Sequence, residues 1–169
     1  MSKQLKWCIA VLAALVLFYT VAAAEGSASN NADQQTITAS GTCGANLTWA
    51  LDSNGVLTVS GSGEIQDCSL GSPWEDHKDT ITGINIEEGV TSIGAHAFGE
   101  CENLTSVTLP DSLTHIGYQS FSYCNSLAGI TIPAGVSGIE AWAFNGCENM
   151  TGISVAGASP EARRRRPAS

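Results

Sequence analysis

The sequence repeats one pattern of apolar residues every 23 positions from Ile81 onward. Three full units and the start of a fourth read ITGINIEEGVTSIGAHAFGECEN, LTSVTLPDSLTHIGYQSFSYCNS, LAGITIPAGVSGIEAWAFNGCEN and MTGISVAG. Seven columns recur in register, and in the first unit they are Ile81, Ile84, Ile86, Val90, Ile93, Phe98 and Cys101. Chance does not give seven columns in register, so residues 81–155 must repeat one structural unit.

Each unit contains a segment with the alternation of a β-strand. Val107 and Leu109 are two residues apart and share one face of a strand, while Thr108 points away. Pro110 and Pro133 end the strand in their units because proline cannot continue a hydrogen-bonded ladder. A single unit has too little core to fold alone, so successive units are expected to stack and pair their strands about 4.8 Å apart. The sequence therefore predicts a mainly β solenoid with one strand in each unit.

The repeat also resembles a known family. Residues Leu104 to Cys124 read L-x-x-V-x-L-P-x-x-L-x-x-I-G-x-x-x-F-x-x-C, which resembles the BspA-like, or treponemal, type of leucine-rich repeat. The segment that often precedes such repeats in secreted bacterial proteins is similar to Gly41, Asn46-Leu47-Thr48-Trp49, Asn54-Gly55, Ser72-Pro73-Trp74 and Gly89-Val90-Thr91-Ser92-Ile93-Gly94. The resemblance implies a leucine-rich-repeat solenoid in a secreted or cell-surface protein that acts in adhesion or protein binding, without a catalytic centre or cofactor.

The N-terminal residues have the pattern of a secretion signal. Lys3 and Lys6 precede an apolar stretch, and Ala22 and Ala24 have the spacing that signal peptidase reads, so residues 1–24 are predicted to be a signal peptide. The alternative is an uncleaved membrane anchor, because the stretch nearly suffices to span a bilayer. Residues 25–35 are small and polar and are expected to be a disordered lead-in.

Residues 36–80 are predicted to form an N-terminal cap that contains a β-hairpin. Two β-prone runs, 46–51 and 56–60, flank Asn54-Gly55, which supplies the positive φ angles of a tight turn. Ser72-Pro73-Trp74-Glu75-Asp76 has the capping residue, proline and acids that begin a short helix.

The cysteines outside the signal fall into two groups. Cys43 and Cys68 both lie in the predicted cap, where an oxidising compartment would allow a disulfide between them. The other three share one repeat column, beside a column of phenylalanines: Cys101, Cys124 and Cys147, with Phe98, Phe121 and Phe144. Ligands that project in parallel from adjacent units do not converge as zinc requires, so we interpret both columns as structural core and predict no metal site.

Residues 156–169 depart from the repeat. Ala156 replaces the proline of earlier units, and GASPEARRRRPAS supplies none of the expected apolar columns. We expect a disordered basic tail on a fragment of a longer protein, the alternative being a naturally short chain. The last strand would then have an unpaired edge, which permits self-association.

Charge and residue spacing exclude several functions. Lys78 is the only lysine or arginine between Lys6 and Arg163, and a surface this acidic does not favour binding to nucleic acid or to anionic membranes. His77, His96 and His115 do not share a repeat column, and no nucleophile, metal or phosphate motif accompanies them. The sequence therefore predicts that the chain is not an enzyme.

Exposed loop positions are the remaining candidates for binding. The strand positions outside the core carry small polar residues such as Thr105 and Thr131, whereas the loops carry the aromatic groups His96, Tyr118, Tyr123 and Trp142. Aromatic side chains are common anchors of protein interfaces, so these four are the predicted ligand-binding residues and an extracellular or cell-surface protein is the predicted partner. The alternatives are that Tyr118 and Trp142 fold back over their own loops, and that the repeats are a passive spacer.

Overall fold

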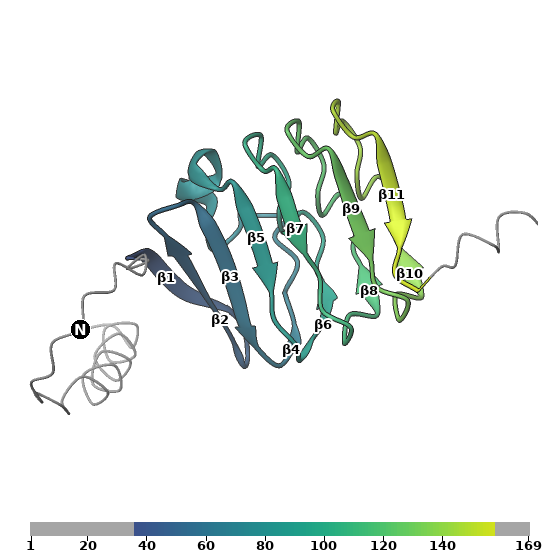
Figure 1. Cartoon of the computed structure of the whole chain (residues 1–169). Helices are drawn as coiled ribbons and strands as arrows, with labels where there is room; N and C mark the ends of the chain where they lie inside the picture. Colours follow the sequence, from purple (N-terminus) through teal and green to yellow (C-terminus); the bar gives the residue numbers. More distant parts are fainter. Residues whose placement is uncertain (1–35, 158–169) are drawn as a thin grey trace, which may run out of the picture. The chain divides into compact units, whose positions relative to one another are not determined.

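The computed structural model describes residues 36–157, which form a β-solenoid of about four turns (Figure 1). The elements, in chain order, are β1 (Ile37–Gly44), β2 (Leu47–Asp52), β3 (Val56–Gly61), β4 (Gly63–Glu64), η1 (Glu75–Thr80), β5 (Gly83–Ile86), β6 (Val90–Ile93), β7 (Ser106–Thr108), β8 (His115–Ile116), β9 (Gly129–Ile132), β10 (Gly138–Ile139) and β11 (Gly152–Val155). The predicted mainly β solenoid with a 23-residue spacing is confirmed. The predicted signal peptide and lead-in, and all of the predicted basic tail except Ala156 and Gly157, lie outside the described residues.

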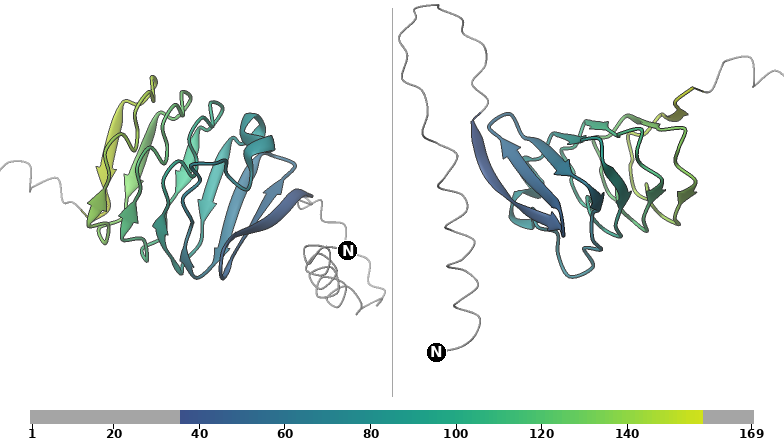
Figure 2. Two further views of the ribbon diagram at one scale, coloured as in Figure 1. Left: turned by 180° about the vertical axis from the view of Figure 1, so that it is seen from behind. Right: turned by 90° about the horizontal axis from the view of Figure 1, so that it is seen from below.

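Each 23-residue unit, called a rung below, contributes two strands rather than the predicted one. The first strands of the units stack in parallel on one side, where Ile84 pairs with Val107 and Ile130 with Ile153. The second strands stack on the other side, in the order β10, β8, β6 and β4 (Figure 2). The sequence did not indicate the second strand, because its apolar residues, such as Val90 and Ile93, are three positions apart and do not alternate.

The pairing of the first strands is interrupted once. One sheet runs β1-β2-β3-β5-β7, and β9 and β11 form a separate pair, so β7 and β9 share no hydrogen-bonded ladder. The expectation that all successive units pair their strands is therefore wrong at this junction. The loops on either side still join these rungs, since the Ser126 amide donates to the Glu102 carbonyl at 3.1 Å.

The N-terminal part of the sheet is antiparallel. The predicted hairpin is present as β2 and β3, in which Trp49 pairs with Val59, and Gly55 in its turn has a φ of 81°. β1 adds a third antiparallel strand that the sequence did not indicate, because its residues are mostly small and polar. β3 then pairs in parallel with β5, so the hairpin leads directly into the repeats.

The predicted helix after Ser72 is a 3₁₀ helix, η1. The Ser72 amide and hydroxyl both donate to the Glu75 carboxylate, at 2.9 and 3.1 Å, and these bonds with the Lys78 ammonium lower the pKa of Glu75. Within residues 36–157 no helix is long and apolar enough to cross a membrane.

A stack of aromatic rings runs along the solenoid core. Phe98 and Phe121 are fully buried, with ring centroids 5.3 Å apart, and Phe144 lies 5.5 Å beyond Phe121. Trp74 extends the stack on the other side, 5.0 Å from Phe98, and its indole N–H donates to the Ala97 carbonyl. Phe144 is only half-buried because no further rung covers it in the described chain, which corrects the expectation that all three phenylalanines are core residues.

The cysteine column links each rung to the one before it. The Cys124 thiol donates to the Phe98 carbonyl at 3.3 Å, and the Cys147 thiol donates to the Phe121 carbonyl at 3.1 Å. Burial raises the pKa of Cys101 to about 12 and raises that of Cys124 further, with a contribution from the neighbouring cysteines. Cys101 and Cys124 are core residues as predicted, whereas Cys147 is half-buried in the last full rung.

Cys43 and Cys68 are both buried free thiols in this structure, so the bridge considered from the sequence is not formed. The Cys68 thiol instead donates to the Gln66 carbonyl at 3.3 Å, which directs it toward its own loop. Burial, and then the neighbouring Cys68, raises the pKa of Cys43 to about 11.

The burial of the column predicts an order of thiol reactivity. We expect Cys147 to be alkylated by iodoacetamide in the folded protein, and Cys101 and Cys124 only after denaturation in urea, because the thiolate is the reactive form and burial disfavours it. Mass spectrometry of peptides from native and denatured samples measures this. Fast native labelling of Cys124 would contradict the observed register.

Candidate functional site

Two loop positions in each rung have a left-handed backbone. The first column contains His96, Gln119 and Trp142, with φ angles of 58°, 51° and 66°. The second contains Glu100, Tyr123 and Gly146, with φ angles of 66°, 59° and 74°. A residue other than glycine costs about 1 kcal/mol or more in this region, so the surrounding contacts must hold these loops in place.

Hydrogen bonds between rungs supply that restraint. The His96 amide donates to the Tyr118 carbonyl at 2.9 Å, and the Tyr123 amide donates to the Asn145 carbonyl at 2.7 Å. Gly146 is required beside Tyr123, because a Cβ at this glycine would lie 2.6 Å from the Tyr123 ring. The backbone of these loops is therefore held in place along one edge of the solenoid.

The four predicted ligand-binding residues occupy this loop edge in two groups. His96 and Tyr118 are brought together, with ring centroids 5.5 Å apart in an edge-to-face arrangement. Trp142 continues the His96 column and exposes 60% of its surface, so it does not fold back over its loop. Tyr123 lies in the second column, packed on Gly146, and is 48% exposed.

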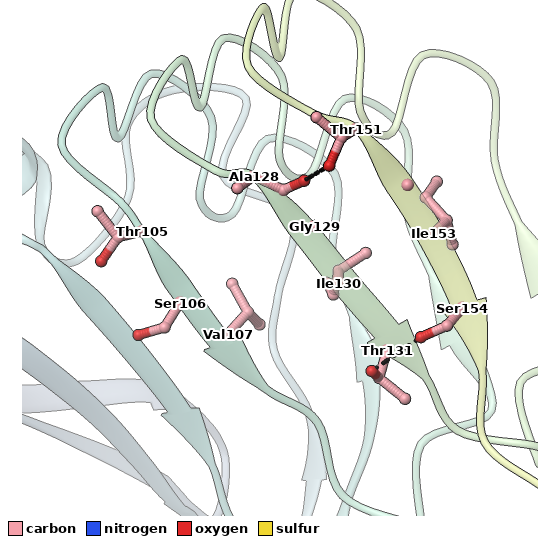
Figure 3. Close-up of a pocket in the computed structure, with 11 residues that line it drawn as sticks. Thr105, Ser106, Val107, Ala128, Gly129, Ile130, Thr131, Thr151, Ile153 and Ser154 are labelled. Carbon is pink, nitrogen blue, oxygen red and sulfur yellow. Dashed lines mark hydrogen bonds between the residues drawn. The ribbon is translucent and has the colours of Figure 1, made fainter.

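A groove follows the opposite, strand side over β7, β9 and β11 (Figure 3). Its volume is about 500 Å³, and Val107 and Ile130 line it together with the hydroxyl groups of the strands. Several hydroxyls are already paired, since Thr131 bonds to Ser154 at 2.9 Å and Thr151 donates to the Ala128 carbonyl at 3.0 Å. The sequence predicted these polar residues but not the groove, which arises where β7 and β9 lack a ladder.

His115 makes a contact between rungs that the sequence did not predict. It shares no repeat column with another histidine, but its Nε2 lies 3.1 Å from a Glu140 carboxylate oxygen, and the other oxygen of Glu140 accepts a hydrogen bond from the Tyr118 amide at 3.0 Å. Gly138 allows this arrangement, because a Cβ there would lie 2.8 Å from the His115 ring. The pair lines a polar groove together with Glu64 and Asp67. The spacing of 25 residues, not a multiple of the repeat, concealed it.

Acidic side chains are unevenly distributed along the solenoid. Most of the carboxylates lie between Asp52 and Asp111, while the segment from Ser112 to Gly157 contains only Glu140 and Glu148. The early rungs are therefore strongly acidic and the last rungs nearly neutral. In the described part of the chain, no group of three histidine, cysteine, aspartate or glutamate side chains could hold a metal ion.

A family model for the BspA type leucine-rich repeat region, written with six copies of the repeat, matches residues 76–160. The chain belongs to this BspA-type family. The match covers the same columns that stack in the solenoid, so the repeat period, the fold and the family agree. No protein among the curated sequences matches this chain.

Solved structures of bacterial leucine-rich repeat proteins are similar to this BspA-type chain. A protein from Eubacterium ventriosum is 25% identical, with a TM-score of 0.50 over 70% of this chain and 45% of its own length. This chain thus spans less than half of that relative. A protein from Bacteroides capillosus is 23% identical, with a TM-score of 0.46 over 66% of this chain and 95% of its own. A leucine rich cell surface protein from Faecalibacterium prausnitzii is 19% identical, with a TM-score of 0.36 over 66% of this chain and 41% of its own.

Proposed function

We propose that this chain is a noncatalytic protein-binding module of the secreted or cell-surface type, which acts in adhesion. The proposal rests on membership of the BspA-type family and on the signal-like residues 1–24. The partner is an extracellular or cell-surface protein, and the loop edge is the surface that contacts it.

The observation that carries the proposal is the exposure of large aromatic groups on a rigid edge. Trp142 and Tyr123 expose 60% and 48% of their surfaces at left-handed loop positions that hydrogen bonds between rungs hold in place. An aromatic side chain on a restrained backbone has only two rotatable bonds, so it loses little conformational entropy on binding and is an effective anchor. Tyr118 is 38% exposed, packs on His96 and adds a polar hydroxyl to the same loop edge.

Charge narrows the class of partner. Glu100 and Glu102 flank the aromatic edge, and Lys78 is the only lysine or arginine in the described chain. Complementary charge raises association rates and selects among partners. The expected partner surface therefore has an apolar recess for an indole ring with lysine or arginine side chains at its rim.

A double substitution tests the site. We expect Tyr118→Ala with Trp142→Ala to weaken binding at least about tenfold, because loss of an anchor of this kind commonly costs more than 1 kcal/mol. Binding is measured by surface plasmon resonance against a panel of extracellular matrix proteins and cell-surface ectodomains. Thermal melting of the variant should be close to that of the parent, because both side chains are exposed.

Two variants serve as controls for this experiment. Ile37→Ala removes an exposed apolar side chain from β1, and Lys78→Ala removes the central cation. Both should leave the affinity unchanged. If the double variant binds as the parent does, the aromatic edge is not the site. If the parent binds no member of the panel, the alternative function of a passive spacer replaces the adhesion proposal.

A further inference from the structure

The last strand of the solenoid is open on one side. Within residues 36–157, β11 pairs only with β9, and all four of its residues are exposed (Figure 1). The equivalent residues one rung earlier are buried, since Ile130 and Ile132 expose 5% and 3%, whereas Ile153 and Val155 expose 45% and 52%. A strand paired on one side directs alternate N–H and C=O groups to its free edge, where they are a template for another strand.

The same end is open on the other side of the solenoid. Ile139, in β10, exposes 49%, although its equivalents Ile93 and Ile116 are fully buried. Phe144 and Met150 between the two strands are half-buried. We call the surface formed by Ile139, Phe144, Met150, Ile153 and Val155 the open end. It contains an unpaired strand edge and an uncovered part of the core.

The charge distribution makes a second copy of this chain a suitable occupant. Net charge is −9 for the whole chain, so most modes of self-association would bring acidic surfaces together. The open end reduces this repulsion, because the segment from Ser112 to Gly157 carries only two carboxylates, Glu140 and Glu148, both in the last full rung.

We propose that two copies of this chain associate end to end through the open end, with β11 of each pairing antiparallel to β11 of the other. A two-fold axis perpendicular to the sheet places Ser154 opposite Ser154 of the second copy and Ile153 opposite its Val155, which keeps both cores on the same side of the joined sheet. The same surface is used by both copies, so the assembly closes as a dimer and does not grow.

The oligomeric state of the chain tests this. Sedimentation velocity over a range up to about 100 μM should show a concentration-dependent dimer. Ile153→Lys should raise the dimer dissociation constant at least tenfold, and Val155→Lys is a second variant with the same expected effect. Leu70→Lys makes the same change at a fully exposed site away from the open end, and it should dimerise as the parent does. Circular dichroism checks that each variant is folded.

Several results would overturn the proposal. They are a parent chain that remains monomeric at the highest concentration, folded lysine variants that dimerise like the parent, or species that grow beyond a dimer. Growth that Ile37→Lys in β1 abolishes would indicate head-to-tail stacking of β11 on β1 instead. Ile153→Lys distinguishes this proposal from the proposed function, because it changes β11 and leaves the aromatic edge intact, whereas Trp142 lines a hollow with Ile139 and Phe144 of the open end.

Discussion

Replacement of Phe121 by alanine should cost about 3–5 kcal/mol of unfolding free energy, a large part of the stability of a domain of this size. Phe121 is fully buried and stacks against a phenylalanine on each side, Phe98 at 5.3 Å and Phe144 at 5.5 Å. A cavity there removes contacts from both neighbouring rungs. Because each rung contacts only its neighbours, the substitution weakens both interfaces of the middle rung and so uncouples the rungs on either side of it. Urea denaturation followed by circular dichroism measures the loss.

Phe144→Ala is the matched control for this prediction. It removes the same side chain from the same column, but Phe144 is half-buried and has one stacking neighbour, so the expected cost is about 1–2 kcal/mol. Leu70→Ala, at a fully exposed side chain, should change the free energy of unfolding by less than about 0.5 kcal/mol. Equal losses for Phe121→Ala and Phe144→Ala would contradict the aromatic stack as the continuous core.

The sequence predicted the repeating part of the fold well because the repeat itself reports burial. A column such as Ile93, Ile116 and Ile139 recurs only if each member occupies the same place in a rung. The 23-residue period does not show whether a rung is covered by another rung on both sides or on one side only. Ile139, Phe144 and Cys147 fit their columns as well as earlier members do, and only the structure shows that they lie at an open end.

Features that depend on a single rung could not be predicted. The ladder between β7 and β9 is absent although Val107 and Ile130 are equivalent in sequence. Trp74 extends the phenylalanine stack from outside the repeats, although the sequence around it indicates a helix start and a family resemblance but no contact with Phe98. At the candidate site, the sequence identified the four aromatic residues but not the contact between His96 and Tyr118. This contact depends on the left-handed backbone at His96, and a left-handed conformation is not predicted at a residue other than glycine.

Alkaline pH should destabilise the protein, because its buried thiols are held in the neutral form. Burial raises the pKa of Cys43 to about 11 and that of Cys101 to about 12, and Cys124 is raised further. In the unfolded chain these thiols ionise near about 8.5. Between these values the unfolded state has lost protons that the folded state retains, so the free energy of unfolding falls as pH rises. The stabilisation is fully present below about pH 8 and is lost progressively above it.

The size of this effect depends on how many thiols ionise on unfolding. Each thiol contributes up to about 1.4 kcal/mol per pH unit within its window, and the strongly shifted group includes Cys43, Cys101 and Cys124. The midpoint of urea denaturation should therefore be constant from pH 7 to about 8 and then decline steeply toward pH 10. Cys124→Ala should be less stable at neutral pH, because the Cys124 side chain is fully buried. Above pH 8, however, its free energy of unfolding should fall less steeply than that of the parent, because one ionising thiol has been removed. An unchanged slope in this variant would mean that Cys124 ionises without unfolding, and would contradict its place between Cys101 and Cys147 in the core column.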